Sequence, residues 1–258
     1  MAGRQGWAVG LAVFSVLFAM GWSWLRKTQS DNQDRSALKR QGVGRIVQIF
    51  YFVGIPYAAI VSGTLPPRLL GLKGVEYFAL IDFQAGAAAA QIQYTIVLVL
   101  LEWFVDAGVS LAAGLAALVV LGGVWISLAR VRVGETTVFQ WSVLDTIYHS
   151  LHWAFYWAIF WGLTGDLYLG VVLGTGFVIL EWILIVQMHQ EWESQQQTLL
   201  VNIFILILTG AIFFYSPNLW LLWPIHLLMV VLIKKLDRTR RKAYMLEPEH
   251  LLSSSFLL

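Results

Sequence analysis

The stretch VLDTIYHSLHWAFYWAIFWGLTGDLYLGVVLGTGFVILEWI, from Val143 to Ile183, decides the fold. It contains two apolar runs separated only by Gly-Leu-Thr-Gly-Asp, which predicts two helices joined by a tight turn. On the first helix, Asp145, His149, His152 and Tyr156 follow one another at spacings of four, three and four residues. Residues at these spacings share one helix face. The sequence therefore predicts a polar stripe on an otherwise apolar helix.

The composition places the chain among integral membrane proteins. Of its 258 residues, 59% are hydrophobic and 12% are charged, about half the charged fraction of an ordinary soluble domain. The net charge is only +2, and the basic residues flank apolar runs, so nucleic acid is not an expected partner. The chain has no cysteine, which excludes disulfides and thiolate chemistry. We expect the lipid bilayer to surround the molecule.

The apolar runs predict an all-α, polytopic transmembrane bundle of about eight helices. The expected spans are 7–25, 46–62, 87–105, 109–128, 139–163, 167–186, 199–215 and 219–233. Between them we expect a basic loop at 26–45 and a polar turn at 187–197. Glu102 and Asp106 carry like charges four residues apart, which favours a solvated helix end.

Three local signals refine this prediction. Charges interrupt the apolar residues of 69–86, which favours an interfacial helix. Pro56 in the second span predicts a kink. Gly170 and Gly174 form a small-xxx-small pattern that predicts close contact with a neighbouring helix.

We expect three regions along the chain. Residues 1–136 hold the N-terminal transmembrane helices with the interfacial segment, 137–233 form a core of four transmembrane helices, and 234–258 form a basic cytoplasmic tail that is flexible from Ala243. Eight spans place both termini on one side, which collects 11 basic residues against 6 in the first loop. The positive-inside rule therefore predicts that both termini are cytoplasmic, although the basic first loop is discordant. We expect the membrane to be a bacterial-type cytoplasmic membrane.

Ionisable side chains inside the apolar runs mark the candidate site. Such groups cost about 2.5 to 3.5 kcal/mol each on insertion scales, so they normally face the bundle interior and one another. His152, Glu181 and His226 are the candidate catalytic residues, and Asp145 and His149 are supporting ones. The same groups can serve interhelical packing through hydrogen bonds. The sequence leaves these two interpretations open.

The segment AIFFYSPNLWLLWPIH, which ends at His226, resembles the last motif region of the CAAX-protease and bacteriocin-processing family of intramembrane endopeptidases. FVILE, ending at Glu181, stands at the place of the family's Phe-xxx-His motif, and HWAFYW, starting at His152, at the place of its Glu-Glu-xxx-Arg motif. The resemblance covers residues 137–233, the two helix pairs of the family's core. In that family a glutamate and a histidine are taken to activate a water for peptide hydrolysis.

The chain departs from the family pattern at several motif positions. It contains no Glu-Glu pair, Trp157 replaces the arginine, Glu181 replaces the first histidine, and only His226 keeps its residue type. The resemblance implies one of two functions. The first is a diverged intramembrane endopeptidase with Glu181 as general base and His152 or His226 orienting the water. The second is a non-catalytic relative that binds a membrane peptide or a partner subunit, so whether the chain is an enzyme stays open here.

Two further classes remain as alternatives. One is a structural or accessory subunit of a larger membrane complex. The other is a metal- or haem-binding protein, in which His149 or His152 with Glu181 and His226 would hold zinc or iron, or a histidine would ligate a haem or chlorin. The motifs of serine hydrolases and of nucleotide-binding proteins are missing. The sequence assigns no particular metal or cofactor.

Overall fold

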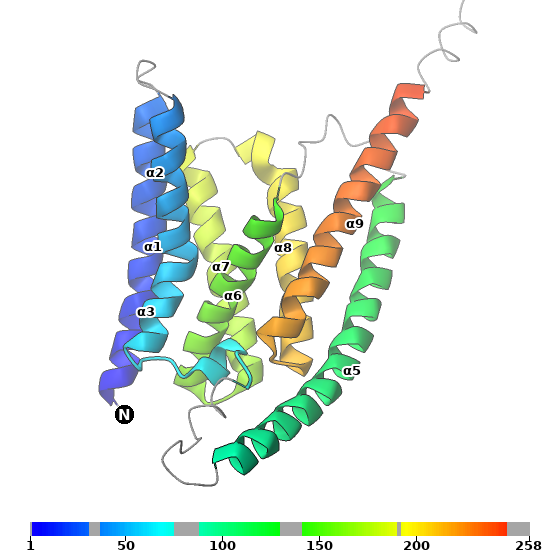
Figure 1. Ribbon diagram of the computed structural model, residues 1–258. Coiled ribbons are helices and arrows are strands. Elements are labelled where there is room, and N and C mark those ends of the chain that lie inside the picture. The colour runs from blue at the N-terminus through cyan, green and yellow to red at the C-terminus, as the bar shows by residue number, and fades with distance from the viewer. Residues whose placement is uncertain (1, 31–36, 75–87, 130–140, 190–191, 247–258) are drawn as a thin grey trace, which may run out of the picture.

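The computed structural model describes residues 2–30, 37–74, 88–129, 141–189 and 192–246, and within these ranges it is all-helical with no strand. This confirms the all-α class. The elements in chain order are α1 (Ala2–Ser30), α2 (Ala37–Ile49), η1 (Phe50–Gly54), α3 (Ile55–Val61), η2 (Pro67–Leu70), α5 (Ala88–Ala129), α6 (Val143–Thr164), α7 (Leu167–His189), α8 (Trp192–Tyr215) and α9 (Leu219–Leu246). Because α2, η1 and α3 follow one another without a break, the described chain forms seven long helical segments that run alternately up and down (Figure 1).

Helix α6 lies at the centre of the bundle. All eight residues from His152 to Ile159 are buried, and the helix contacts α1, α3, η1, η2, α7 and α9. A capping box formed by Ser142 and Asp145 fixes its start, and Gly165 ends it with a φ of 71°. Protein therefore surrounds the His, Trp and Tyr side chains of this stretch.

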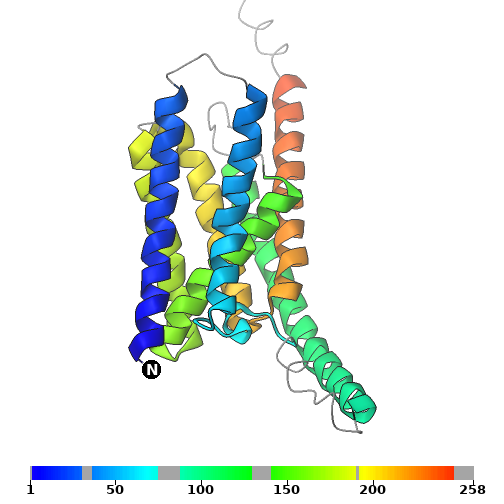
Figure 2. The ribbon, with the colours of Figure 1, turned by 60° about the vertical axis from the view of Figure 1, so that its left-hand side comes forward.

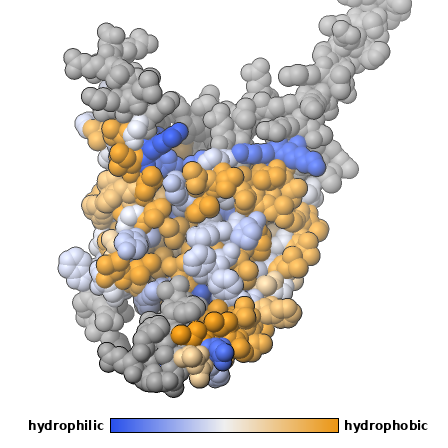
Figure 3. Space-filling model, viewed as in Figure 1, coloured by the Kyte–Doolittle hydropathy of each residue, from blue (hydrophilic) through white to orange (hydrophobic). Residues whose placement is uncertain are grey.

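Four helices of the described chain are long and apolar enough to cross a membrane: Gly6–Thr28, Gly42–Val61, Ala89–Gly123 and Leu167–Gln187. Leu199–Tyr215 is a shorter apolar helix. Apolar residues cover the middle of the face shown in Figure 3, and hydrophilic residues lie along its upper margin. These features are compatible with a helical membrane protein, whereas the predicted count of eight spans is not confirmed.

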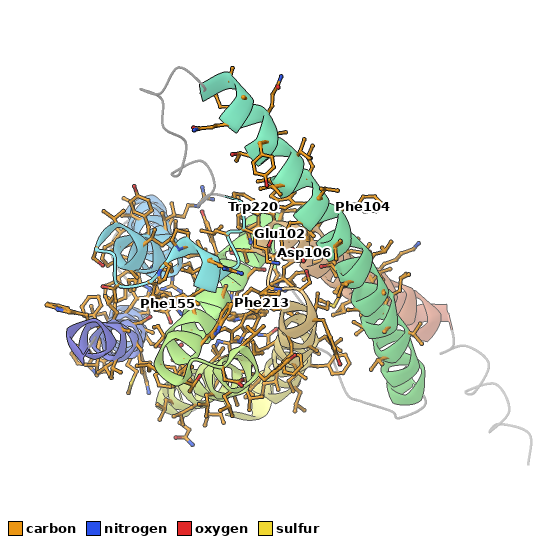
Figure 4. The ribbon with its side chains drawn as sticks, turned by 90° about the horizontal axis from the view of Figure 1, so that it is seen from below. Glu102, Phe104, Asp106, Phe155, Phe213 and Trp220 are labelled. Atoms are coloured by element: carbon orange, nitrogen blue, oxygen red, sulfur yellow. The ribbon has the colours of Figure 1, made fainter. Side chains whose placement is uncertain are left out.

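The prediction of separate spans at 87–105 and 109–128 was wrong, because both belong to the 42-residue helix α5. We expected a solvated helix end at Glu102 and Asp106. Instead, these carboxylates lie on the side of α5 that faces Trp220 and the bundle, while Phe104 points away (Figure 4). A helix of this length extends about 63 Å, and its lower half leaves the bundle obliquely (Figures 1 and 2).

Polar segments predicted as loops are largely helical. Helix α1 continues to Ser30 and α2 begins at Ala37, inside the expected loop 26–45. Helix α7 ends at His189 and α8 begins at Trp192, inside the expected turn 187–197. Helix α9 continues to Leu246, past the expected start of a flexible tail, and 247–258 lie outside the described residues. Lys, Arg, Gln and Glu are good helix formers, so helices continue beyond their apolar parts.

The disturbance expected at Pro56 takes the form of a π-helical turn, η1, just before it. Proline lacks an N–H, and its ring clashes with the carbonyl four residues earlier, here that of Phe52. The wider turn accommodates this clash, and the N–H of Ile55 donates to the carbonyl of Phe50. The same turn brings the rings of Tyr51 and Phe52 to 4.3 and 5.2 Å from the ring of His152.

A buried ion pair ties α5 to the lower end of the bundle. Lys73 Nζ lies 2.9 Å from Oδ2 of Asp106 and 3.5 Å from Oε1 of Glu102. Asn218 Nδ2 donates to Asp106 Oδ2 at 3.1 Å, so the turn between α8 and α9 joins the same network. Of the predicted interfacial helix 69–86, the described part is the end of η2 followed by turns, and 75–87 lie outside the described residues.

The close contact predicted for Gly170 and Gly174 is confirmed. A Cβ at Gly170 would lie 2.6 Å from the Trp161 Cα, and one at Gly174 would lie 2.9 Å from the Trp157 backbone nitrogen. Both values are shorter than any tolerated contact, so only glycine lets α7 approach α6 this closely.

The first and last described helices have their outer ends at opposite ends of the bundle. The N-terminus is at the lower end of α1, and α9 finishes at the upper end (Figure 1). The eight-span prediction placed both termini on one side. The difference arises because α5 replaces two predicted spans, so the described chain reverses direction one time fewer.

Candidate functional site

The predicted polar stripe of α6 exists, and it packs against the segment formed by α2 and η1. Gln48 Nε2 donates to Asp145 Oδ1 at 3.0 Å near the top of the stripe. Lower down, the Phe52 ring lies 4.8 Å from the ring of His149. The stripe is therefore covered by protein, as expected for ionisable groups at membrane depth.

The centre of the site is a carboxylate and an imidazole from adjacent helices. His152 Nε2 on α6 lies 3.9 Å from Oε2 of Glu181 on α7, and each side chain is only 3% exposed. Tyr51 on η1 donates its hydroxyl hydrogen to Oε1 of Glu181. The His152–Glu181 distance is longer than a direct hydrogen bond, and both ring nitrogens of His152 are buried with no hydrogen-bond partner in the described protein.

Tyr156 closes the site toward α1. Its hydroxyl donates to Oγ of Ser15 at 3.0 Å, and its ring stands edge-on to His152 at a centroid distance of 4.8 Å. The phenol also interacts electrostatically with the Glu181 carboxylate. The two tyrosines, the histidine and the glutamate thus form one buried cluster, which we call the Tyr51–His152–Glu181 site.

His226 does not join that site. Its Nδ1 lies 2.5 Å from Oγ of Ser150, and its ring stacks on Trp153 with centroids 5.0 Å apart. Its Nε2 has no hydrogen-bond partner among the described residues. His226, Ser150 and Trp153 therefore form a second buried cluster on α6 and α9.

The residues predicted as a metal site are divided between these two clusters. Among the residues that the structure describes, no group of three or more His, Cys, Asp and Glu side chains is placed to hold a metal ion. His152 and Glu181 alone would supply two of the ligands that such a site needs.

Asp145 and His149, predicted as supporting residues, are engaged at the start of α6. Asp145 Oδ2 accepts the N–H of Ser142 at 2.8 Å in the capping box. His149 Nδ1 lies 2.7 Å from the Asp145 carbonyl oxygen, and its ring stacks on Trp141 at 4.2 Å. Both residues fix the position of the helix that carries His152.

A cavity of about 410 Å³ lies beside the Tyr51–His152–Glu181 site, between α1, the α2–η1 segment and α7. Tyr51 lines this cavity, and its hydroxyl donates to Glu181, so this residue connects the cavity to the site. The cavity is lined by Phe18, Ala19, Trp22, Ser23, Arg26, Val47, Gln48, Tyr51, Phe52 and Ile185.

Sequence reasoning did not identify Tyr51. Its position in an apolar helix could have indicated a polar partner, because a buried tyrosine hydroxyl needs a hydrogen-bond partner. That signal does not name the partner. Glu181 is 130 positions away in the chain, and the two groups meet because η1 packs against α6, which in turn packs against α7.

Comparison with protein-family models, with curated protein sequences and with solved structures finds no match to this chain.

Proposed function

We propose that this protein is a diverged intramembrane endopeptidase whose acid–base pair is Glu181 and His152. One observation carries the proposal: a carboxylate and an imidazole from adjacent helices lie 3.9 Å apart in a buried site. A polar contact of this length is suited to a bridging water. Carboxylate and imidazole side chains are the commonest general acids and bases in enzymes.

The chemistry follows from the position of these groups. Glu181 takes a proton from a water held between Oε2 and His152 Nε2, and the water oxygen attacks the carbonyl carbon of a peptide bond. The carbon–nitrogen bond then breaks, and the proton passes to the leaving amine. Tyr51, which donates to the other Glu181 oxygen, orients the carboxylate toward the water.

The family resemblance supports the type of chemistry but not the same residues. The family uses a glutamate and a histidine, and here the same two residue types occur at exchanged motif positions, with Glu181 in place of a histidine and His152 in place of a glutamate. We assign no step to His226, since its contacts are with Ser150 and Trp153.

A second candidate function is a non-catalytic relative that binds a membrane peptide or a partner subunit. The separation of His226 from His152 and Glu181 favours this candidate, because the one motif residue that matches the family lies in a different cluster. The two candidates differ in whether Glu181 is needed for cleavage or only for folding.

The deciding experiment is a cleavage assay with purified protein in detergent or proteoliposomes, using quenched-fluorescence peptides with an apolar transmembrane segment. We expect Glu181→Gln and His152→Ala to lower the cleavage rate at least about 100-fold, the lower range for loss of a general base. Glu102→Gln is the matched control, and His226→Ala should retain cleavage in its folded fraction. Full activity in Glu181→Gln, or no cleavage by the wild-type protein, would reject the peptidase and favour the binding protein.

We infer that the upper end of the bundle faces the cytoplasm of a bacterial-type membrane and that the N-terminus lies on the opposite side. Of the 17 basic residues, 14 lie in the part of the chain that the structure describes, and seven alternating helical segments put only 3 of them at the lower end, namely Arg4, Arg68 and Lys73. Eleven lie in helical segments at the upper end: Arg26, Lys27, Lys39, Arg40, Arg45, Lys234, Lys235, Arg238, Arg240, Arg241 and Lys242. This asymmetry follows the positive-inside rule. The basic residues of the predicted first loop, which conflicted with the rule when eight spans were assumed, agree with it here.

A further inference from the structure

The cavity between α1 and the α2–η1 segment has a charged edge and apolar walls. Arg26 lines it from near the upper end of α1, while Phe18, Val47, Phe52 and Ile185 supply apolar surface. Its volume of about 410 Å³ accommodates part of an amphiphilic molecule but not a folded domain. The lining therefore suits a ligand with an anionic head and an apolar body.

Arg26 is placed to bind an anion at the edge of this cavity. Its guanidinium carbon lies 5.3 Å from the centre of the Trp22 ring, and its Nη2 would lie 3.4 Å from a Cβ at Gly44, so the side chain reaches from α1 across to α2. Within the described residues no carboxylate forms an ion pair with Arg26. An arginine guanidinium matches phosphate oxygens with two parallel hydrogen bonds.

We propose that this cavity binds an anionic phospholipid, with the phosphate on Arg26 and the start of an acyl chain along Phe18 and Phe52. The position of Arg26 along α1 favours a lipid over a water-soluble anion as the ligand. Arg26 lies at the basic end of the molecule, with Trp22 one turn below it, which is the arrangement of the headgroup level of a membrane. The apolar residues below would gain nothing from a free phosphate.

This lipid would contact Tyr51 in the cavity wall, whose hydroxyl donates to Glu181. Occupation of the cavity would therefore hold the Tyr51 ring in the position from which its hydroxyl reaches the carboxylate. The lipid site does not depend on the Tyr51–His152–Glu181 site being catalytic, so each proposal can fail alone.

The test uses the full chain, purified and delipidated in a neutral detergent, with bound lipid counted by native mass spectrometry. The probes are phosphatidylglycerol and phosphatidylcholine with identical acyl chains. We expect the wild-type protein to bind phosphatidylglycerol at least about tenfold more tightly, and Arg26→Gln to abolish that preference. Arg68→Gln removes an exposed arginine at the lower end and should leave both affinities within about twofold of the wild type.

A second pair of variants tests the apolar part of the cavity. Ala19→Trp places an indole among the lining residues and should weaken both lipids together, whereas Ala112→Trp on the exposed side of α5 should weaken neither. The proposal is overturned if Arg26→Gln binds phosphatidylglycerol like the wild type, or if Arg68→Gln loses affinity equally. It is also overturned if inorganic phosphate, or a peptide with a free carboxyl terminus, displaces the lipid at equal concentration.

Discussion

The distance of 3.9 Å between His152 Nε2 and Glu181 Oε2 is set by how closely α6 and α7 pack. These two helices share the most extensive contact in the bundle. Gly170 and Gly174 permit it, because any side chain there would meet the backbone of Trp161 or Trp157. The contact between His152 and Glu181 therefore depends on two glycines that carry no chemistry themselves.

Replacing Gly170 by alanine tests this dependence. The new Cβ would lie 2.6 Å from backbone atoms of Trp161, which cannot move without shifting α6. We expect a loss of about 1–3 kcal/mol in the free energy of unfolding, the usual cost of overpacking. Gly176→Ala on the same helix is the control, since its Cβ would meet nothing within 4 Å. Reversible unfolding in mixed micelles measures both, and equal stability of the two variants would contradict the prediction.

Removing the hydroxyl of Tyr51 should destabilise the site. Tyr51→Phe leaves Oε1 of the buried Glu181 carboxylate without the donor that it has in the wild-type protein. We expect a cost of about 1–3 kcal/mol in the free energy of unfolding, as for other unsatisfied buried polar groups. Tyr57→Phe, at an exposed position on the following helix, should change the stability by less than about 0.5 kcal/mol. Indistinguishable unfolding curves for the two variants would show that the Tyr51 hydrogen bond adds nothing to stability.

The ion pair between Lys73 and Asp106 should be strongly coupled. Both side chains are 12% exposed, so Asp106→Asn leaves a largely buried ammonium group without its main partner. We expect this variant to lose about 3–5 kcal/mol, and the double variant Lys73→Met with Asp106→Leu to recover most of that loss. Glu102→Gln should cost much less, because Glu102 is 29% exposed and lies 3.5 Å from Lys73. A double variant no more stable than Asp106→Asn would argue against coupling.

The inferred orientation can be measured directly because the chain has no cysteine of its own. Gly6→Cys lies near the lower end and Gly42→Cys near the upper end, both at exposed positions where a Cβ meets nothing within 4 Å. In intact bacterial spheroplasts, a membrane-impermeant maleimide should label the first variant and not the second. After the membrane is permeabilised, both should react. Labelling of the second variant and not the first before permeabilisation would contradict the inferred orientation, because it would place the upper end outside the cytoplasm.

Several features of the fold are determined by local sequence. The α6 stripe follows from residue spacing alone, because a helix repeats every 3.6 residues and places Asp145, His149 and His152 on one face. The contact made by Gly170 and Gly174 also follows from spacing, since two small residues four positions apart form a groove for a neighbour. These properties need no knowledge of the rest of the chain.

The charged residues of the sequence did not predict the helix boundaries correctly. Glu102 and Asp106 read as a solvated helix end, yet they lie inside the continuous helix α5, because Lys73 and Asn218 pair with Asp106 from elsewhere in the chain. A charge in an apolar run has the same appearance in the sequence whether it meets water or a buried partner. Local sequence cannot distinguish the two cases. The predicted number of helices depended on this distinction, and so did the prediction that both termini lie on one side.

The partners within the site were decided only by the tertiary structure. The sequence indicated His152, Glu181 and His226 as one group, but packing joins the first two with Tyr51 and leaves His226 with Ser150 and Trp153. Helical periodicity determines which residues share a face of one helix, whereas the choice of neighbouring helices results from long-range packing of the whole bundle. The sequence by itself therefore determined that ionisable groups line α6, and the tertiary structure determined which of them meet.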